Sequence, residues 1–132
     1  MSQYASRYDS DVLAQLSGYE HTVAYQKSYD LLLHLHKKCQ KLPKYEKFSL
    51  QKDIRDTAND MIDEIEVFER TKSVSHLYNA DRLKNRLYRC IRLAYDMKYS
   101  GMNASAYEYC AKQIAEIGKC IGGLIANIKG NG

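Results

Sequence analysis

The most constraining feature of this sequence is a repeat of apolar residues at steps of three and four. Between residues 47 and 70 the apolar positions are separated mostly by Asp, Glu, Lys and Arg. They are Ile54, Ala58, Met61, Ile65 and Phe68. An α-helix brings residues three and four apart onto one face, so this pattern predicts a helix with a single apolar stripe.

Three further segments have the features of helices. Residues 22–42 contain neither glycine nor proline, and Pro43 ends this segment because proline cannot donate to the helical ladder. A third helix is predicted over residues 75–99 with Gly101 as its stop, and a fourth after the favourable N-cap Asn103. The apolar lines of the three segments are Val23, Leu31, Leu32, Leu35 and Cys39; Leu77, Ala80, Leu83, Leu87, Ile91 and Ala94; and Tyr107, Cys110, Ile114, Ile117, Ile121, Ile125 and Ile128.

The order and length of these segments predict the fold. A chain of 132 residues can bury one hydrophobic core. Helices of similar length with short connections place sequence neighbours antiparallel, and no strand pattern competes. We therefore predict an all-α, antiparallel up-and-down four-helix bundle over residues 22–128. Residues 1–21 are predicted to be an arm or lead-in helix, and residues 129–132 a C-terminal tail.

The last predicted helix has a second stripe beside its isoleucines, made of small residues. They are Ala111, Ala115, Gly118, Gly122 and Ala126. A helix that is apolar over much of its girth is covered on more than one side. Two interpretations fit: the helix lies centrally in the bundle, or the small stripe is a contact between subunits.

Charge is distributed unevenly along the chain. Residues 44–69 contain eight acidic and four basic side chains, whereas residues 70–98 contain eight basic and two acidic ones. On a helix, Arg82, Arg86 and Arg89 fall within a narrow sector opposite the apolar line, with Arg92 on its flank. A row of guanidinium groups suits phosphate oxygens, so this face is the candidate nucleic-acid site. Alternatively, the arginines pair with the acidic second helix or only solubilise the bundle.

Tyrosines accompany the arginines on the third predicted helix. Tyr78, Tyr88 and Tyr95 border the basic sector. Their rings are suited either to stacking on bases or to completing the core.

Motifs for catalysis and metal binding are absent from the sequence, which contains no GxGxxG, P-loop, GxSxG or HExxH pattern. His36 and Cys39 share a helical face but lack further ligands, and no histidine follows a glutamate by three residues. We predict no catalytic residue, no metal site and no cofactor.

The cysteine spacing and the lack of long apolar runs indicate the cellular compartment. The four cysteines are far apart and form no CxxC pair, no signal peptide is recognisable, and no apolar run is long enough to span a membrane. These features predict a cytoplasmic protein with reduced cysteines and no membrane partner.

Two stretches carry a resemblance to a known family. His76-Leu77-Tyr78-Asn79-Ala80-Asp81 and the segment Ile114-Ala115-Glu116-Ile117-Gly118-Lys119-Cys120-Ile121-Gly122-Gly123-Leu124-Ile125 resemble the accessory variability determinant proteins of diversity-generating retroelements. That family lies within a wider group of four-helix bundles that includes proteins encoded in intervening sequences of ribosomal RNA genes. The similarity extends loosely over residues 22–128.

The resemblance implies an assembly and a set of partners. It implies a homopentameric ring of bundles with a basic surface, including a basic residue at Arg92. It also implies a non-catalytic accessory protein that binds a reverse transcriptase and template RNA or complementary DNA. The alternative is a structural four-helix bundle of the ribosomal RNA intervening-sequence type, without a retroelement role.

Overall fold

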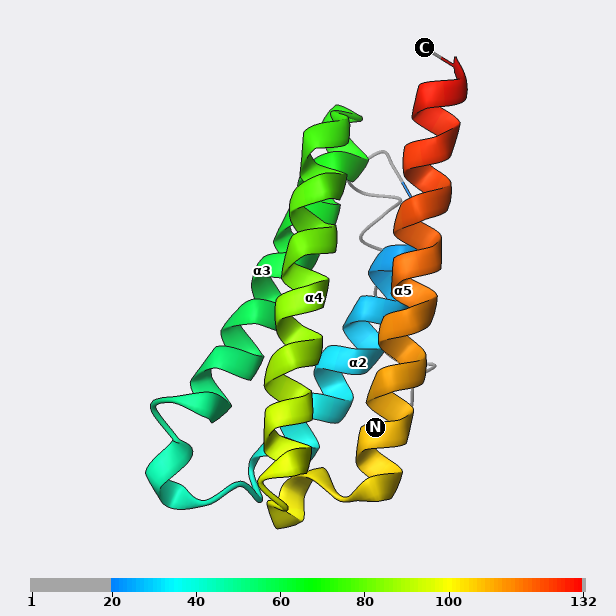
Figure 1. The fold of residues 1–132 in the computed structure, drawn as a ribbon. Helices are drawn as coiled ribbons and strands as arrows, with labels where there is room; N and C mark the ends of the chain where they lie inside the picture. The colour runs from blue at the N-terminus through cyan, green and yellow to red at the C-terminus, as the bar shows by residue number, and fades with distance from the viewer. Residues whose placement is uncertain (1–19, 132) are drawn as a thin grey trace.

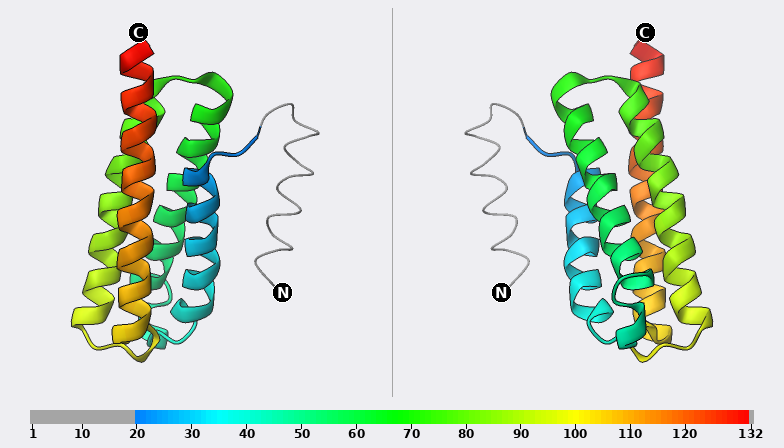
Figure 2. Two further views of the ribbon diagram at one scale, coloured as in Figure 1. Left: turned by 90° about the vertical axis from the view of Figure 1, so that its right-hand side faces the viewer. Right: turned by 90° about the vertical axis from the view of Figure 1, so that its left-hand side faces the viewer.

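The computed structural model describes residues 20–131, which form four α-helices and contain no β-strand. The helices are α2 (Val23–Cys39), α3 (Leu50–Thr71), α4 (Val74–Asp96) and α5 (Ala104–Asn131). Two short 3-10 helices, η1 (Lys44–Glu46) and η2 (Ser100–Met102), lie in the first and last connections. The helices run up and down beside one another, and α5 projects past the others at its carboxyl end (Figures 1 and 2). The predicted all-α, antiparallel four-helix bundle is confirmed.

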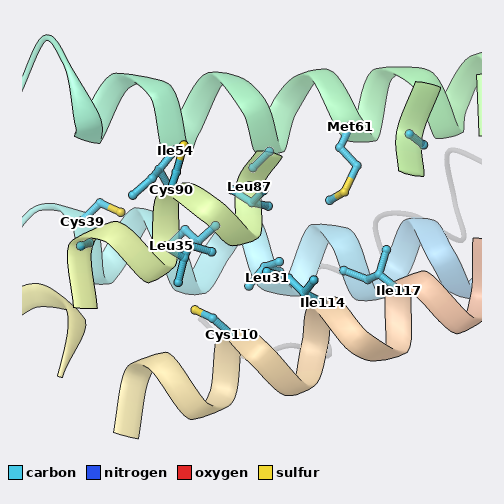
Figure 3. Close-up of a cluster of buried hydrophobic side chains, with 14 of the residues drawn as sticks. Leu31, Leu35, Cys39, Ile54, Met61, Leu87, Cys90, Cys110, Ile114 and Ile117 are labelled. Atoms are coloured by element: carbon cyan, nitrogen blue, oxygen red, sulfur yellow. The ribbon is translucent and has the colours of Figure 1, made fainter. Parts of the chain in front are cut away.

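The core forms where the apolar stripes of the four helices meet. Each helix packs against its sequence neighbours, and α5 closes the bundle against α2. The side chains of Leu31, Ile54, Leu87 and Ile117 are fully buried and face one another across this interior (Figure 3). Every position of the predicted α3 stripe is at most 3% exposed. Val23 differs from the prediction: it is 61% exposed because it lies on the outer side of the first turn of α2.

The first predicted helix ends three residues earlier than expected, at Cys39 rather than Leu42. The next residues form 3-10-type turns, in which the Leu42 N–H donates to the Cys39 carbonyl, and Leu42 is buried. The Ser100 hydroxyl donates to the Lys41 carbonyl at 3.2 Å. A helix end leaves carbonyl groups without partners, so these contacts stabilise the shortened terminus.

Gly101 acts differently from the predicted helix stop. Helix α4 ends at Asp96, and the left-handed residue just after it is Lys98, with φ 60°. Gly101 instead allows a close approach between two connections, because a Cβ built on it would lie 2.5 Å from the Lys38 carbonyl oxygen. The glycine is therefore required by tertiary packing.

The predicted N-cap of the last helix is confirmed. The Ala106 N–H donates to Asn103 Oδ1 at 2.9 Å. Helix α5 continues to Asn131, beyond the end of the predicted bundle domain at residue 128. At the other end of the chain, the predicted arm or lead-in helix (residues 1–21) lies outside the described residues except for its last two positions.

A buried carboxylate joins the beginning of α2 to the end of α3. Glu69 is 2% exposed and accepts hydrogen bonds from Thr22 N–H (2.6 Å), Thr22 O–H (2.9 Å) and His21 Nδ1 (2.8 Å). The Tyr25 N–H donates in turn to Thr22 Oγ1, so Thr22 caps α2 while Glu69 holds the cap.

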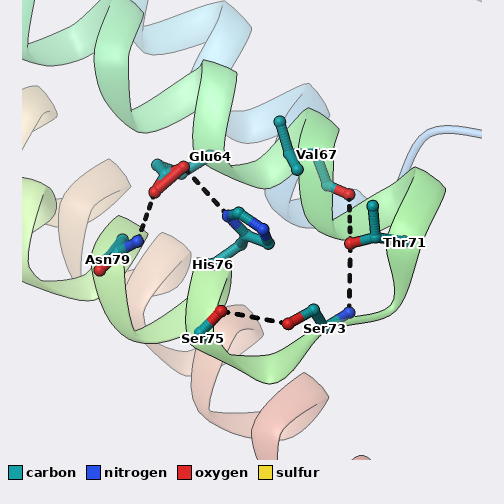
Figure 4. A network of polar contacts seen from close by, with 7 residues as sticks. All are labelled: Glu64, Val67, Thr71, Ser73, Ser75, His76 and Asn79. Atoms are coloured by element: carbon teal, nitrogen blue, oxygen red, sulfur yellow. Dashed lines mark hydrogen bonds and ion pairs between the residues drawn. The ribbon is translucent and has the colours of Figure 1, made fainter.

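A second polar cluster lies beside the tight α3–α4 turn (Figure 4). Glu64 accepts from His76 Nδ1 at 3.2 Å and from Asn79 Nδ2 at 2.5 Å. The turn itself consists of Lys72, in the left-handed conformation with φ 60°, and Ser73. Glu64 thereby fixes the register between the two helices just below their connection.

Candidate nucleic-acid interface

The four arginines predicted from the sequence lie together on the outer side of α4, and we call this set the arginine face (Arg82, Arg86, Arg89, Arg92). All four residues are exposed. Leu77, Leu87 and Ile91 on the opposite side of the same helix are 0% exposed. The face extends over eleven helical positions, or about 15 Å along the helix axis. Along one nucleic-acid strand this length corresponds to several phosphates.

The middle of the arginine face is hollowed. A depression of about 360 Å³ is lined by Arg82, Leu83, Asn85, Arg86 and Arg89. Guanidinium groups and one amide therefore surround a recess with a small apolar floor. Such a surface offers several N–H donors to one phosphate group.

Three of the four guanidinium groups have no carboxylate partner in the part of the chain that the structure describes. Within residues 20–131, Arg82, Arg86 and Arg89 form no ion pair. Arg92 pairs with Asp96 at 3.4 Å, with both side chains more than half exposed. An exposed pair of this kind contributes little free energy, so a phosphate can compete for Arg92.

The acidic helix α3 does not neutralise the arginine face. The α3 carboxylates that have partners in the described residues use others: Asp56 pairs with Lys52, Glu64 binds α4 through His76 and Asn79, and Glu69 binds the start of α2. The alternative in which the arginines pair with the second predicted helix is thus not observed in this part of the chain.

Two of the three tyrosines near the basic sector, Tyr88 and Tyr95, contact Tyr107 of α5. The hydroxyls of Tyr88 and Tyr107 lie 2.5 Å apart, and this hydrogen bond raises the pKa of Tyr107. Tyr95 stacks on Tyr107 with ring centroids 4.4 Å apart. Tyr78 is 43% exposed, and Lys129 Nζ lies 5.5 Å from its ring. Of the two interpretations of these rings, helix packing applies to Tyr88 and Tyr95.

The small stripe of α5 is largely uncovered within one chain. Ala115, Gly122 and Ala126 are exposed, and Ala111 and Gly118 are half-buried. A Cβ built on Gly122 would meet no atom within 4 Å. Helix α5 packs on α2 and α4 through its isoleucine stripe. Within one chain, α5 is therefore covered by α2 and α4 on its isoleucine side, while most of the small stripe stays exposed.

The histidines and cysteines form no site for a metal ion. No group of three or more His, Cys, Asp or Glu side chains in residues 20–131 is arranged to hold one. His36 is exposed whereas Cys39 is 1% exposed, so the pair does not share an accessible face. All four cysteines are free thiols, and burial raises the pKa of Cys39 and of Cys110 to about 12. These two thiols pack as small apolar side chains.

The bAvd-like family matches residues 22–128 of the chain. The chain belongs to the bAvd-like family. No curated protein sequence matches it at a significant level.

In this bAvd-like protein, the first of the two resembling stretches mainly supports the fold. Leu77 and Ala80 are fully buried, while His76 and Asn79 bind Glu64 of α3. Asp81 pairs with Lys84 at 2.9 Å. The stretch thus fixes how α4 begins against α3 and leads directly into the arginine face.

The second stretch of the bAvd-like chain has both a buried and an open side. Ile117 and Ile121 are fully buried, and Glu116 pairs with Lys27 of α2 at 3.2 Å. Gly122 and Gly123 meet no neighbouring atom within 4 Å of an added Cβ. The open glycines are the part of this stretch available to a second chain.

Sequence reasoning did not single out an exposed aromatic pair near η1. Tyr45 is 75% exposed and Phe48 is 82% exposed. The available signal was the alternation of lysines and aromatic residues over positions 44–48.

No helix among residues 20–131 has the length and apolar content required to cross a membrane.

Proposed function

We propose that this bAvd-like protein is a non-catalytic accessory component of a diversity-generating retroelement. It binds the reverse transcriptase together with template RNA or complementary DNA, in the cytoplasm, and it supports mutagenic reverse transcription. The observation that carries the proposal is the arginine face. Three of its guanidinium groups form no ion pair within the described residues. The chain that presents this face belongs to the bAvd-like family.

The arginine face acts by binding phosphate groups. Its side chains extend from one helix in a single row, so they follow a strand without reading base edges, and sequence preference is small. Three to four phosphate contacts per protomer correspond to a slope of about −2 to −4 in log K against log salt. Binding to one protomer is therefore weak at physiological ionic strength.

Oligomerisation multiplies this weak contact. The exposed glycines and alanines of α5 allow close approach of another helix backbone, and the family resemblance implies a homopentamer. A pentamer presents about twenty such arginines, and simultaneous engagement of several subunits raises the apparent affinity through effective concentration. The oligomer thus holds the template near the reverse transcriptase.

A double charge reversal tests the arginine face. Arg86→Glu with Arg89→Glu should abolish binding of RNA and single-stranded DNA at low salt in a fluorescence anisotropy titration. Both side chains are exposed, so helicity and oligomer size should stay unchanged. The matched control, Lys37→Glu with Arg70→Glu, makes the same change in charge at exposed positions of α2 and α3 and should retain binding.

The carboxylate of Asp96 provides a test in the opposite direction. Asp96→Asn removes the partner of Arg92 and one negative charge beside the arginine face. We expect tighter binding and a salt slope steeper by about one contact. Equal binding by Asp96→Asn and the wild type would restrict the phosphate contacts to the other three arginines.

The polymerase partner is tested separately. The reverse transcriptase encoded at the same locus should co-purify with the wild-type protein from cells that express both. A protein that binds neither nucleic acid nor a reverse transcriptase would instead be a structural bundle of the ribosomal RNA intervening-sequence type.

A further inference from the structure

The end of the bundle that carries η1 and η2 exposes two aromatic rings to solvent. Tyr45 and Phe48, on the connection between α2 and α3, are 75% and 82% exposed. Neither ring contributes to the core, although Leu42 and Leu50 on either side of them are buried. Two large aromatic side chains within four positions therefore project into solvent.

The backbone and one ring of this connection are nonetheless held in place. The Tyr45 hydroxyl donates to Tyr99 Oη at 3.4 Å, and the two rings meet edge to face with centroids 6.3 Å apart. The Tyr99 hydroxyl donates to Glu46 Oε2 at 2.7 Å, while Ser49 O–H and Leu50 N–H donate to Glu46 Oε1. The exposed face of Tyr45 is thus presented from a fixed position.

The surroundings of the two rings are basic. Lys44, Lys47 and Lys98 are exposed and form no ion pair within residues 20–131. Lys47 Nζ lies 5.5 Å from the Phe48 ring centroid. The carboxylate of Glu46, which lies between Tyr45 and Lys47 in the sequence, accepts three hydrogen bonds, and these lower its pKa. We call Lys44, Tyr45, Lys47, Phe48 and Lys98 the loop-end surface.

A recess adjoins this surface. It measures about 360 Å³ and is lined by Tyr95, Asp96, Lys98, Tyr99, Ser100, Met102 and Asn103. Tyr99 borders the recess and also contacts Tyr45, so the recess continues the loop-end surface. Its volume lies at the lower end of the range found for small-molecule pockets.

We propose that the loop-end surface binds single-stranded nucleic acid, with bases stacked on Phe48 and Tyr45 and phosphates bound by Lys44, Lys47 and Lys98. The inference rests on the proposed function, because it assigns a second, strand-selective contact to the same nucleic acid. Lys98 follows Arg92 by six residues, so a strand lying along α4 reaches this end of the bundle.

Stacking makes the loop-end surface selective for unpaired bases. Every base has a π-face, but in a duplex these faces are covered by neighbouring base pairs. The arginine face reads phosphates and binds single strands and duplexes alike. The two rings of the loop-end surface add affinity only for single strands, and truncating one of them weakens single-strand binding roughly five-fold or more.

Three variants of Phe48 separate stacking from other causes. We would titrate the full chain with a fluorescein-labelled mixed-sequence single strand and with the same strand annealed to its complement. Phe48→Ala and Phe48→Leu should weaken single-strand binding roughly five-fold or more and leave duplex binding within about two-fold. Phe48→Tyr keeps an aromatic face and should bind as the wild type does. Val23→Ala, an exposed apolar residue at the start of α2, is the matched control and should change nothing.

A base analogue gives a second reading of the same contact. The wild type and Phe48→Tyr should quench the fluorescence of 2-aminopurine in the single strand. Phe48→Leu should quench it less than these two proteins do. Wild-type binding by Phe48→Leu, or equal loss for single strand and duplex, would overturn the proposal and would favour a protein contact for these rings.

The same titrations distinguish this inference from the proposed function. If Arg86→Glu with Arg89→Glu abolishes binding while the Phe48 variants bind normally, only the loop-end surface is wrong. If the wild-type protein binds no nucleic acid at low salt, the proposed function and the loop-end surface are both wrong.

Discussion

The ammonium nitrogen of Lys84 on α4 lies 2.9 Å from the point where a Cβ on Gly118 of α5 would stand. The same nitrogen pairs with Asp81 at 2.9 Å. Lys84 therefore connects the two stretches that resemble the family, since Asp81 ends the first and Gly118 lies in the second. Glycine at position 118 leaves room for the lysine to lie between the helices.

Gly118→Ala should be tolerated, because the added methyl group meets the end of a flexible lysine side chain that can move away. Alanine is favoured over glycine inside a helix by about 0.5–1 kcal/mol. Displacing Lys84 from its ion pair with Asp81, whose side chains are 17% and 42% exposed, costs about the same. We expect a free energy of unfolding within about 1 kcal/mol of the wild type, measured by urea denaturation.

Gly101→Ala is the contrasting substitution. Its methyl group would meet the Lys38 carbonyl oxygen at 2.5 Å and the Leu42 nitrogen at 3.2 Å, and these backbone atoms belong to the end of α2 and to the turns that follow it. The connection between α4 and α5 would have to move away from α2. We expect a loss of about 1–3 kcal/mol in the free energy of unfolding by the same urea method. A wild-type value would show that this connection is mobile enough to absorb the methyl group.

Gly122 separates helix stability from assembly. Gly122→Ala meets no atom within 4 Å in one chain, so it should stabilise α5 by about 0.5–1 kcal/mol. Gly122→Arg places a long charged side chain on the small stripe. If this stripe is the subunit contact, the arginine variant should be a helical monomer by multi-angle light scattering, whereas the wild type is an oligomer. Lys119→Arg, at an exposed position of the same helix, should retain the wild-type mass.

The periodicity of the sequence was sufficient to predict the helices and most of their buried faces. Steps of three and four depend only on helix geometry, and the α3 stripe from Ile54 to Phe68 is buried as predicted. The exposure of the arginine face follows from the same geometry, because a residue opposite a buried line faces away from the core. The exposure of the four arginines could therefore be predicted from the sequence alone.

The polar contacts could not be foreseen in this way. Thr22 and Glu69 are 47 residues apart, and their hydrogen bond depends on how α2 and α3 are docked. Tyr88 lies near the basic sector on a helical projection, yet its hydroxyl bonds to Tyr107 because α5 approaches from that side. The roles of Gly101 and Lys98 at the end of α4 also depend on the neighbouring connection. Local patterns do not contain these tertiary relationships.

His34 gives the stability of the bundle a pH dependence with a defined sign. Burial, followed by the charges of Lys38 and Lys37, lowers the pKa of His34 below its usual 6.5. Its ring lies 4.3 Å from that of Tyr109, and Nε2 is buried without a hydrogen-bond partner in the described structure. Below about pH 6.5 the unfolded chain binds a proton that the folded chain does not, so stability falls as pH decreases. The melting temperature of His34→Gln should drop less than that of the wild type between about pH 7.5 and 5.5.

Glu69 should be the most sensitive polar residue of the bundle. Glu69→Ala removes one carboxylate that accepts from Thr22 N–H, Thr22 O–H and His21, and it leaves the two Thr22 donors without this acceptor. Each unsatisfied buried group costs about 1–3 kcal/mol, so we expect a loss of about 2–4 kcal/mol in the free energy of unfolding. Asp60→Ala, at an exposed position of the same helix, should stay within about 0.5 kcal/mol.

A double-mutant cycle identifies the cause of the Glu69 effect. Thr22→Val alone should cost about 1 kcal/mol or more, because it removes both the cap of α2 and one hydrogen bond to Glu69. Once Glu69 is alanine, Thr22 has lost its orienting partner, so the second substitution should cost less than it does alone. A coupling free energy of about 0.5–3 kcal/mol is expected from urea denaturation of the four proteins. Strictly additive costs would mean that Glu69 stabilises the end of α3 independently of the Thr22 cap.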